Sequence, residues 1–472
     1  MKELYKQTAR QMVELLRTRQ VSPLEAIDAA AVRIEETDGH LNALPTLCIE
    51  RAREHAKKLM AEPPEEGERG QLYGLPIAVK DLVDVAGVRS TKGSPIYANW
   101  TPRESSYSVG ILEGNGALVI GKSNTPEFGA GANTFNEVFG KTRNPWDTRT
   151  TCGGSSGGSA VALASGQVWL ATGSDLGGSL RIPASFCSVV GLRPSPGRVP
   201  EGPKALPFET LSVDGPMGRT VGDTALMLDA TAGHHIGDPL SYPPPERPYV
   251  DAVDSPKAPA RIAYTPDLGI APVATEVKEG CARAAKLLEE MTAVEEDTID
   301  LHDARETFQV LRAAQFAANM KPLLGSHRDK LKPEIIWNVE KGLALSRRDV
   351  EKAQAARGAL FHRVSAFFQQ YDLLVCPTVS VPPFDVNVRY PTEIEGIEMD
   401  NYVDWLLLTF ALTLTSCPAI SVPCGFTESG LPVGLQIVGP PRGEAQVLSA
   451  AALFEEAMGL AEKVPVDPVV KH

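Results

Sequence analysis

Cysteine is scarce in this chain of 472 residues, and its seven copies are scattered along the sequence. No two of them stand as a CxxC pair, and an odd number cannot all be joined in pairs. We therefore expect no disulfide framework. Reduced cysteines are typical of a protein of the cytoplasm, and this is the location that we predict.

Positive charge and long apolar runs are also in short supply. The chain has 46 Lys and Arg against 59 Asp and Glu, a formal net charge of −13, which argues against binding to nucleic acid or to an anionic membrane. The opening stretch MKELYKQTARQMVELLRTRQ contains no apolar core of a signal peptide. No window of about eighteen residues is both apolar and uncharged, so we expect no transmembrane helix.

Several common catalytic motifs are missing. The stretch GGSSGGSA lacks the GK[ST] ending of a nucleotide-binding loop, and no HExxH sequence marks a zinc site. A Ser–His–Asp hydrolase usually shows GxSxG, whereas GSDLG has Asp175 at its centre. These absences disfavour phosphate-loop, metal-dependent and Ser–His–Asp chemistry, and we predict no metal ion.

What is present indicates an α/β protein of ordinary composition, with 43% hydrophobic and 22% charged residues. Ser22, Pro23 and Glu25 have the pattern of a helix start. The apolar runs LPIAVKD, GALVIGKSN and QVWLATGSD are typical of buried strands. Their alternation with helical patterns predicts a single large α/β/α layered domain, in which helices flank a mixed central β-sheet, together with a helical insertion.

The pattern also predicts how the chain is divided. We expect residues 1–65 to form a helical segment that packs on the core. Residues 66–240 and 371–472 are expected to build that core. Residues 241–370, which begin with a proline-rich stretch, are expected to be a largely helical insertion that caps the substrate pocket.

Two stretches rich in small residues stand out, TCGGSSGGSA at 151–160 and GSDLGGSLRIP at 173–183. Glycines allow successive backbone N–H groups to turn inward and form a concavity that binds an anion, such as a tetrahedral oxyanion. Lys80 ends the apolar run GLPIAVKD. The plainer alternatives are two flexible turns and a lysine that reaches solvent, but flexible linkers do not usually separate buried strands.

These stretches, with RNPWD and the C-terminal CPAISVPCGFTESGLPVGLQIVG, resemble the amidase signature family of serine hydrolases. The likeness spans nearly the whole chain, since SPLEAIDAAAVRIEETDGHLNAL is similar to that family's N-terminal helix. It implies a catalytic triad of a lysine, a serine preceded by a cis peptide bond, and a nucleophilic serine. Matched residue by residue, these are Lys80, Ser155 and Ser179, with the cis bond between Gly154 and Ser155.

The resemblance also implies a mechanism. Ser155 would take the proton of the Ser179 nucleophile and pass its own to Lys80, and water would then hydrolyse the acyl-enzyme. Lysine is a base only when neutral, and burial would lower its pKa from about 10.4, although the adjacent Asp81 would oppose this. No cofactor is implied, and the partners are a small-molecule amide and water, with no nucleic acid and no membrane.

Further site residues follow from the same resemblance. The expected oxyanion hole consists of backbone N–H groups of Leu176, Gly177, Gly178 and Ser179. The residues expected to support the triad are Ser156, Ser174, Asp175 and Arg181, the last two as an ion pair across the loop. The loop PEFGAGANTF is expected to line the acyl pocket through Gly129, Ala130 and Gly131.

The main hypothesis is therefore an amidase that cleaves a carboxylic amide C–N bond, with anilides, esters and carbamates as further candidates. A second is the glutaminase chain of a tRNA-dependent amidotransferase. Such chains usually carry glutamine after the aspartate of LSVDGPMGRT, where this chain has Gly215. A third is a binding protein of the same fold without activity, against which the complete triad weighs. The substrate stays open, and so does a homodimer.

Overall fold

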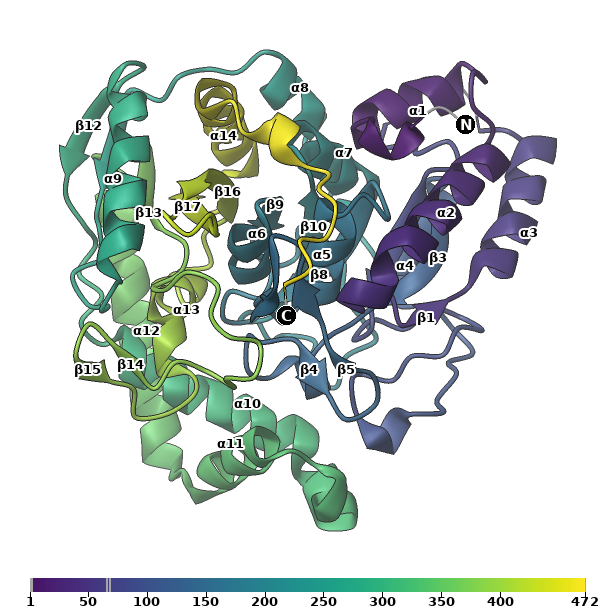
Figure 1. Cartoon of the computed structure of the whole chain (residues 1–472). Helices are drawn as coiled ribbons and strands as arrows, with labels where there is room; N and C mark the ends of the chain where they lie inside the picture. The colour runs from purple at the N-terminus through teal and green to yellow at the C-terminus, as the bar shows by residue number, and fades with distance from the viewer. Residues whose placement is uncertain (1–2, 65–66, 68, 472) are drawn as a thin grey trace.

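The computed structural model describes residues 3–64, 67 and 69–471, and a mixed sheet of 11 strands forms its centre. Helices flank this sheet, so the predicted α/β architecture is confirmed (Figure 1). In their order across the sheet, the strands are β1 (Thr46–Leu47), β3 (Leu118–Ser123), β2 (Pro76–Lys80), β8 (Leu170–Asp175), β10 (Val213–Gly218), β9 (Val190–Arg193), β16 (Ala419–Phe426), β17 (Pro432–Val438), β13 (Leu373–Pro377), β11 (Arg261–Tyr264) and β12 (Ala293–Glu296).

The helices follow the chain from one end of the sheet to the other. The first three lie beside β1 and β3, whereas α9 lies beside β12 at the opposite end (Figure 1). The α-helices are α1 (Ala9–Arg17), α2 (Pro23–Leu41), α3 (Ile49–Ala61), α4 (Tyr107–Gly114), α5 (Gly157–Ala164), α6 (Arg181–Cys187), α7 (Val221–Thr231), α8 (Tyr249–Asp254), α9 (Thr275–Glu289), α10 (Ala304–His327), α11 (Pro333–Ala344), α12 (Arg347–Phe367), α13 (Leu407–Thr413) and α14 (Glu444–Met458).

Local sequence explains where several of these elements begin. Ser22 caps α2, because its hydroxyl accepts the Glu25 N–H while the Glu25 carboxylate accepts the Ser22 N–H, and Pro23 occupies the first turn. The three apolar runs predicted as strands form β2, β3 and β8. Every residue of β2 and β3 is buried, as expected for strands covered on both faces.

The sheet topology brings the two glycine-rich stretches together. Strand β2 runs parallel to β8, so both strands end at the same edge of the sheet. Lys80 is the last residue of β2, and Asp175 is the last residue of β8. Helices α5 and α6 begin just after the two stretches, at Gly157 and Arg181. The carboxyl ends of β2 and β8 therefore position the candidate site.

The segment 241–370 contains α8 to α12 and also two strands. Strands β11 and β12 pair in parallel with each other, and β11 pairs in parallel with β13, so this segment extends the central sheet. Helices α10 and α11 project away from the sheet (Figure 1). The boundary expected at 65–66 lies outside the described residues, and the division of the chain into segments stays a prediction.

Buried hydrophobic residues form two large clusters, one around the N-terminal elements and one around the C-terminal half. A smaller cluster attaches α10 and α11 to a loop near the site, through Phe316 and Ile335 on the helices and Ala130 on the loop. No helix in the described part of the chain is long and apolar enough to cross a membrane. All seven cysteines are free.

Candidate active site

Lys80 lies at the centre of the site and is fully buried. Its Nζ lies 2.8 Å from Ser155 Oγ and 2.9 Å from both Ser156 Oγ and Ser174 Oγ. An ammonium group donates three hydrogen bonds, and these hydroxyls accept three. When the amine is neutral it has a lone pair, so one hydroxyl can turn its own proton toward Nζ. The arrangement is therefore suited to proton exchange between Lys80 and a serine.

The electrostatic surroundings of Lys80 favour the neutral amine. Burial lowers its pKa to about 7, while the charges of Asp214 and Asp175 act in the opposite direction. Asp81, which follows Lys80 in sequence, does not pair with it. Its carboxylate accepts hydrogen bonds from Lys122 Nζ at 3.1 Å and from the Thr91 backbone N–H. The opposition expected from Asp81 therefore goes to another buried lysine.

Ser155 follows a cis peptide bond to Gly154, as the family resemblance implies. The Ser156 backbone N–H donates to the Ser179 carbonyl oxygen at 3.2 Å, which joins the two glycine-rich stretches. Ser155 and Ser179 both line one cavity of about 180 Å³. Among the hydrogen bonds of the described residues, none links their two hydroxyls. The structure therefore brings Lys80 into contact with Ser155 and places Ser179 at the same cavity.

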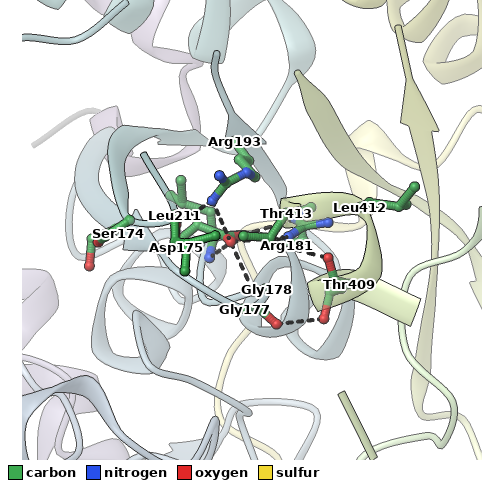
Figure 2. Close-up of polar contacts among 12 residues, drawn as sticks. Ser174, Asp175, Gly177, Gly178, Arg181, Arg193, Leu211, Thr409, Leu412 and Thr413 are labelled. Atoms are coloured by element: carbon green, nitrogen blue, oxygen red, sulfur yellow. Dashed lines mark hydrogen bonds and ion pairs between the residues drawn. The ribbon is translucent and has the colours of Figure 1, made fainter. Parts of the chain in front are cut away.

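The loop that carries Ser179 is held by a buried carboxylate, Asp175 (Figure 2). Its two oxygens accept Arg181 Nε and Nη2, each at 3.0 Å, and Arg193 Nη1 donates to Oδ1 at 3.2 Å. Burial alone would raise the pKa of Asp175, but the two guanidinium groups and the Gly178 N–H hold it well below its usual range. The ion pair between Asp175 and Arg181, expected from the sequence, is formed in full burial.

Two further contacts fix the same loop from the opposite side. Thr409 Oγ1 donates to the Gly177 carbonyl oxygen at 2.7 Å, and Arg181 Nη2 donates to Thr413 Oγ1 at 3.2 Å (Figure 2). Gly178 has a φ of +120°, and a Cβ there would overlap Thr409. Glycine at 178 therefore allows α13 to pack directly against the loop.

The expected oxyanion donors do not all face the cavity. The Gly178 N–H donates to Asp175 Oδ1 at 2.8 Å, so the carboxylate already uses that amide. Leu176 and Ser179 line the cavity itself. The expectation of an oxyanion hole consequently rests on the N–H groups of Leu176, Gly177 and Ser179.

The loop predicted to line the acyl pocket contributes unequally. Gly129 lines the cavity that contains the serines. Ala130 is buried below the cap, and its carbonyl oxygen accepts Lys332 Nζ at 2.6 Å. Gly131 lies beside that same lysine. Neither Ala130 nor Gly131 is among the residues that line the cavity.

The helix α10 supplies a cavity wall that sequence reasoning did not place. Three polar residues on one face of α10 reach the cavity, namely Arg312, Gln315 and Asn319. Their spacing of three and four residues in an alanine-rich helix is the sequence signal that would have found them. The apolar lining residues are Leu82, Phe128, Leu176, Phe316 and Met320, and Ser212 adds a further hydroxyl.

Among the described residues, no group of three or more His, Cys, Asp or Glu side chains is placed to hold a metal ion. The chemically active groups of the cavity are instead hydroxyls, one buried amine and backbone N–H groups. Such a set can transfer protons and stabilise an oxyanion.

Comparisons with known proteins agree with this chemistry. The family model for amidases matches residues 25–448. The chain is 35% identical to an acylamidase of Rhodococcus erythropolis over 468 residues, which cover 98% of each chain. It is also 35% identical to the GatA-type chain of the glutamyl-tRNA(Gln) amidotransferase of Moorella thermoacetica, over 96% of this chain and 97% of that one. The crystal structure of a bacterial aryl acylamidase of the amidase signature family superposes with a TM-score of 0.90 at 29% identity, covering 97% of this chain and 98% of the other.

Proposed function

Because the chain belongs to the amidase signature family and hydrolyses carbon–nitrogen bonds of non-peptide amides, we propose that it does so through an acyl-enzyme formed on Ser179. In this mechanism neutral Lys80 is the base and Ser155 carries the proton between them. The support for this assignment is the 2.8 Å contact between Lys80 Nζ and Ser155 Oγ, at a cavity that Ser179 also lines.

The proposed reaction has two halves. In the first, Ser179 Oγ attacks the amide carbon while its proton passes to Ser155 Oγ, whose own proton passes to Lys80 Nζ. Backbone N–H groups of Leu176, Gly177 and Ser179 stabilise the oxyanion. The C–N bond then breaks, and the departing amine takes the proton back along the same path. In the second half, water attacks the ester and releases the acid by the reverse transfers.

The names of the relatives suggest the substrate class. Acylamidase and aryl acylamidase are names of amide-cleaving enzymes, and we propose N-acyl anilides as the first substrates to assay. Esters and carbamates are secondary candidates, because the same oxyanion hole can stabilise their tetrahedral intermediates.

The test is to replace the nucleophile and follow both turnover and covalent labelling. We expect Ser179→Ala to lower anilide hydrolysis by more than about 10⁴-fold and to prevent labelling by a fluorophosphonate. The control is Ser429→Ala, which removes an exposed serine far along the chain. If Ser179→Ala hydrolyses the anilide at the wild-type rate, Ser179 is not the nucleophile.

Glutamine hydrolysis within an amidotransferase is the second candidate, and similarity to the Moorella thermoacetica chain favours it. The packing at Gly215 weighs against it. A Cβ at this position would lie 2.5 Å from the Leu192 carbonyl oxygen and 2.6 Å from Leu180 Cδ1, so the glutamine usual in such glutaminase chains does not fit here. Glutaminase activity that depends on co-purified partner proteins would revive this candidate.

We also propose that the enzyme works in the cytoplasm, on a small-molecule amide and water. Six of its seven free cysteines are buried, as expected of a chain that folds without disulfides. The proposal includes no nucleic acid, in keeping with the net charge of −13, and a homodimer is compatible with it.

A further inference from the structure

A buried guanidinium group lies at the wall of the catalytic cavity. Arg312 on α10 lines the cavity, although only 7% of the residue is exposed. Its Nη2 donates to the Tyr402 hydroxyl at 2.8 Å, and its Nη1 donates to Asn338 Oδ1. Both partners are neutral groups, so these hydrogen bonds hold the guanidinium in place without neutralising its charge.

No carboxylate among the described residues forms an ion pair with Arg312, and the nearby carboxylates have other partners. Glu334 accepts hydrogen bonds from Arg389, and Asp404 accepts them from Arg305. The contrast with Arg305 is direct, since it belongs to the same helix and carries a carboxylate partner.

The remaining charges near Arg312 are positive. Lys332 and Lys341 are close enough for the Arg312 charge to lower their pKa values, after the larger effect of burial. The guanidinium also lies over the rings of Phe316 and Tyr402, at 4.4 and 5.4 Å from the ring centres. Aromatic faces offset part of the cost of burying a cation, but they do not supply a negative charge.

The cavity has room for a ligand that would supply it. Its volume of about 180 Å³ compares with a buried cavity of about 150 Å³ that holds benzene in another protein. Apolar side chains, including Leu82, Phe128 and Met320, line the space together with the serines and Arg312. An apolar spacer can therefore run along the cavity, with the scissile amide at the serines and a charged end at α10.

A second polar group on α10 has no partner. Gln315 Oε1 is buried at the cavity and makes no hydrogen bond within the described part of the protein. Because no bond holds this oxygen, the amide can rotate and present its NH₂ donors instead. Arg312 and Gln315 can then both donate to one acidic group.

We propose that the cavity selects amides that carry a carboxylate, and that Arg312 binds this carboxylate as a specificity-determining residue. The proposal rests on the proposed function, because it takes the serines as the reacting end of the cavity. The substrate class is thus a carboxylate joined through a short apolar spacer to the amide that is cleaved.

The experiment compares charged and neutral substrates of matched shape. On the acyl side, the anilide of glutaric acid is compared with 5-methylhexanoic anilide, in which isopropyl replaces the carboxylate. On the amine side, N-butyryl-4-aminobenzoate is compared with N-butyryl-4-isopropylaniline. In at least one pair, we expect wild-type kcat/KM to be about 10- to 150-fold higher for the carboxylate, the range for a hydrogen bond to a charged group.

Variants of α10 then assign the preference. Arg312→Met should remove the preference and leave the neutral substrate within about threefold of wild type, whereas Arg312→Lys should retain part of it. Arg305→Met is the matched control and should keep the full preference. A wild-type enzyme without preference in either pair would overturn the proposal even if Arg312→Met fails to fold, and so would an Arg312→Met enzyme that keeps the preference.

Failure of this proposal is distinct from failure of the proposed function. If the neutral anilide is hydrolysed and Ser179→Ala abolishes that activity, the acyl-enzyme mechanism stands whatever the carboxylate preference. If Ser179→Ala leaves hydrolysis intact, the mechanism fails, and the carboxylate site would then have to be located anew.

Discussion

At the scale of single residues, the site depends on which buried charges have partners. Lys80 has three hydroxyl neighbours and no carboxylate in direct contact, whereas Lys122 is equally buried and bonds to Asp81. A lysine without a close carboxylate loses its proton more readily when buried. This difference explains why Lys80 is suited to act as a base and why Lys122 is suited to hold the fold.

Asp214 is expected to set the pH range in which Lys80 is neutral. It lies opposite Ser174 in the β8–β10 pair, so the two side chains share a face of the sheet, and Ser174 Oγ contacts Lys80 Nζ. Its charge raises the pKa of Lys80. We therefore predict that Asp214→Asn shifts the acid limb of kcat/KM to lower pH, whereas the exposed Asp251→Asn leaves it in place. A shift to higher pH would contradict this role.

Asp175 is expected to matter for stability as well as activity. Asp175→Asn would leave Arg181 and Arg193 buried without their shared carboxylate. Breaking such a buried network by removing one partner costs about 3–5 kcal/mol. We predict a loss of this size in the free energy of unfolding, measured by urea denaturation.

The exposed ion pair between Arg347 and Glu351 provides the control for that measurement. Surface pairs of this kind contribute about 0–1 kcal/mol, so Glu351→Gln should change the free energy of unfolding very little. Equal effects of the two substitutions would show that burial does not give the Asp175 network its importance.

At the scale of elements, close approach of backbones decides how α5 is placed. Gly158 lies in α5, and a Cβ there would lie 2.6 Å from the Ala43 carbonyl oxygen and would overlap the Asn124 backbone. The helix that follows Ser155 therefore packs directly on the loops after α2 and β3. Such contact fixes the first glycine-rich stretch relative to the sheet.

We predict opposite effects of Gly→Ala in two helices. Gly158→Ala should lower the free energy of unfolding and the activity, because the methyl group meets backbone that cannot move aside. Gly358 in α12 has open space around it, so Gly358→Ala should raise stability by about 0.5–1 kcal/mol through helix propensity. Thermal unfolding measures both, and stabilisation by Gly158→Ala would contradict the packing argument.

At the scale of the whole molecule, one sheet joins distant parts of the chain. Strand β9 lies between β10 and β16, so the N-terminal part of the core is completed by a strand near the C-terminus. We predict that residues 1–240 expressed alone do not unfold cooperatively, because β9 would lose a neighbour and its apolar face would be exposed. A cooperative urea transition of that fragment, followed by circular dichroism, would contradict this.

Sequence reasoning reached the parts of this molecule that are encoded locally. The strands ending at Lys80 and Asp175 are continuous apolar runs, and the glycine-rich stretches resemble a known family. The wall formed by Arg312 on α10 could not be predicted, because no local pattern tells which face of a distant helix meets the serines. The capture of the Gly178 N–H by Asp175 was missed for a similar reason, since it depends on how the loop folds around a carboxylate.

The central claim is that neutral Lys80 draws the proton from Ser179 through Ser155. The most direct test is the rate of Ser179 acylation in single turnovers of wild-type enzyme between pH 5 and pH 9. With the pKa of Lys80 lowered to about 7, the mechanism predicts a plateau above that pH and a fall of about tenfold per unit below it. A rate that stays constant down to pH 5 would contradict the role of the lysine.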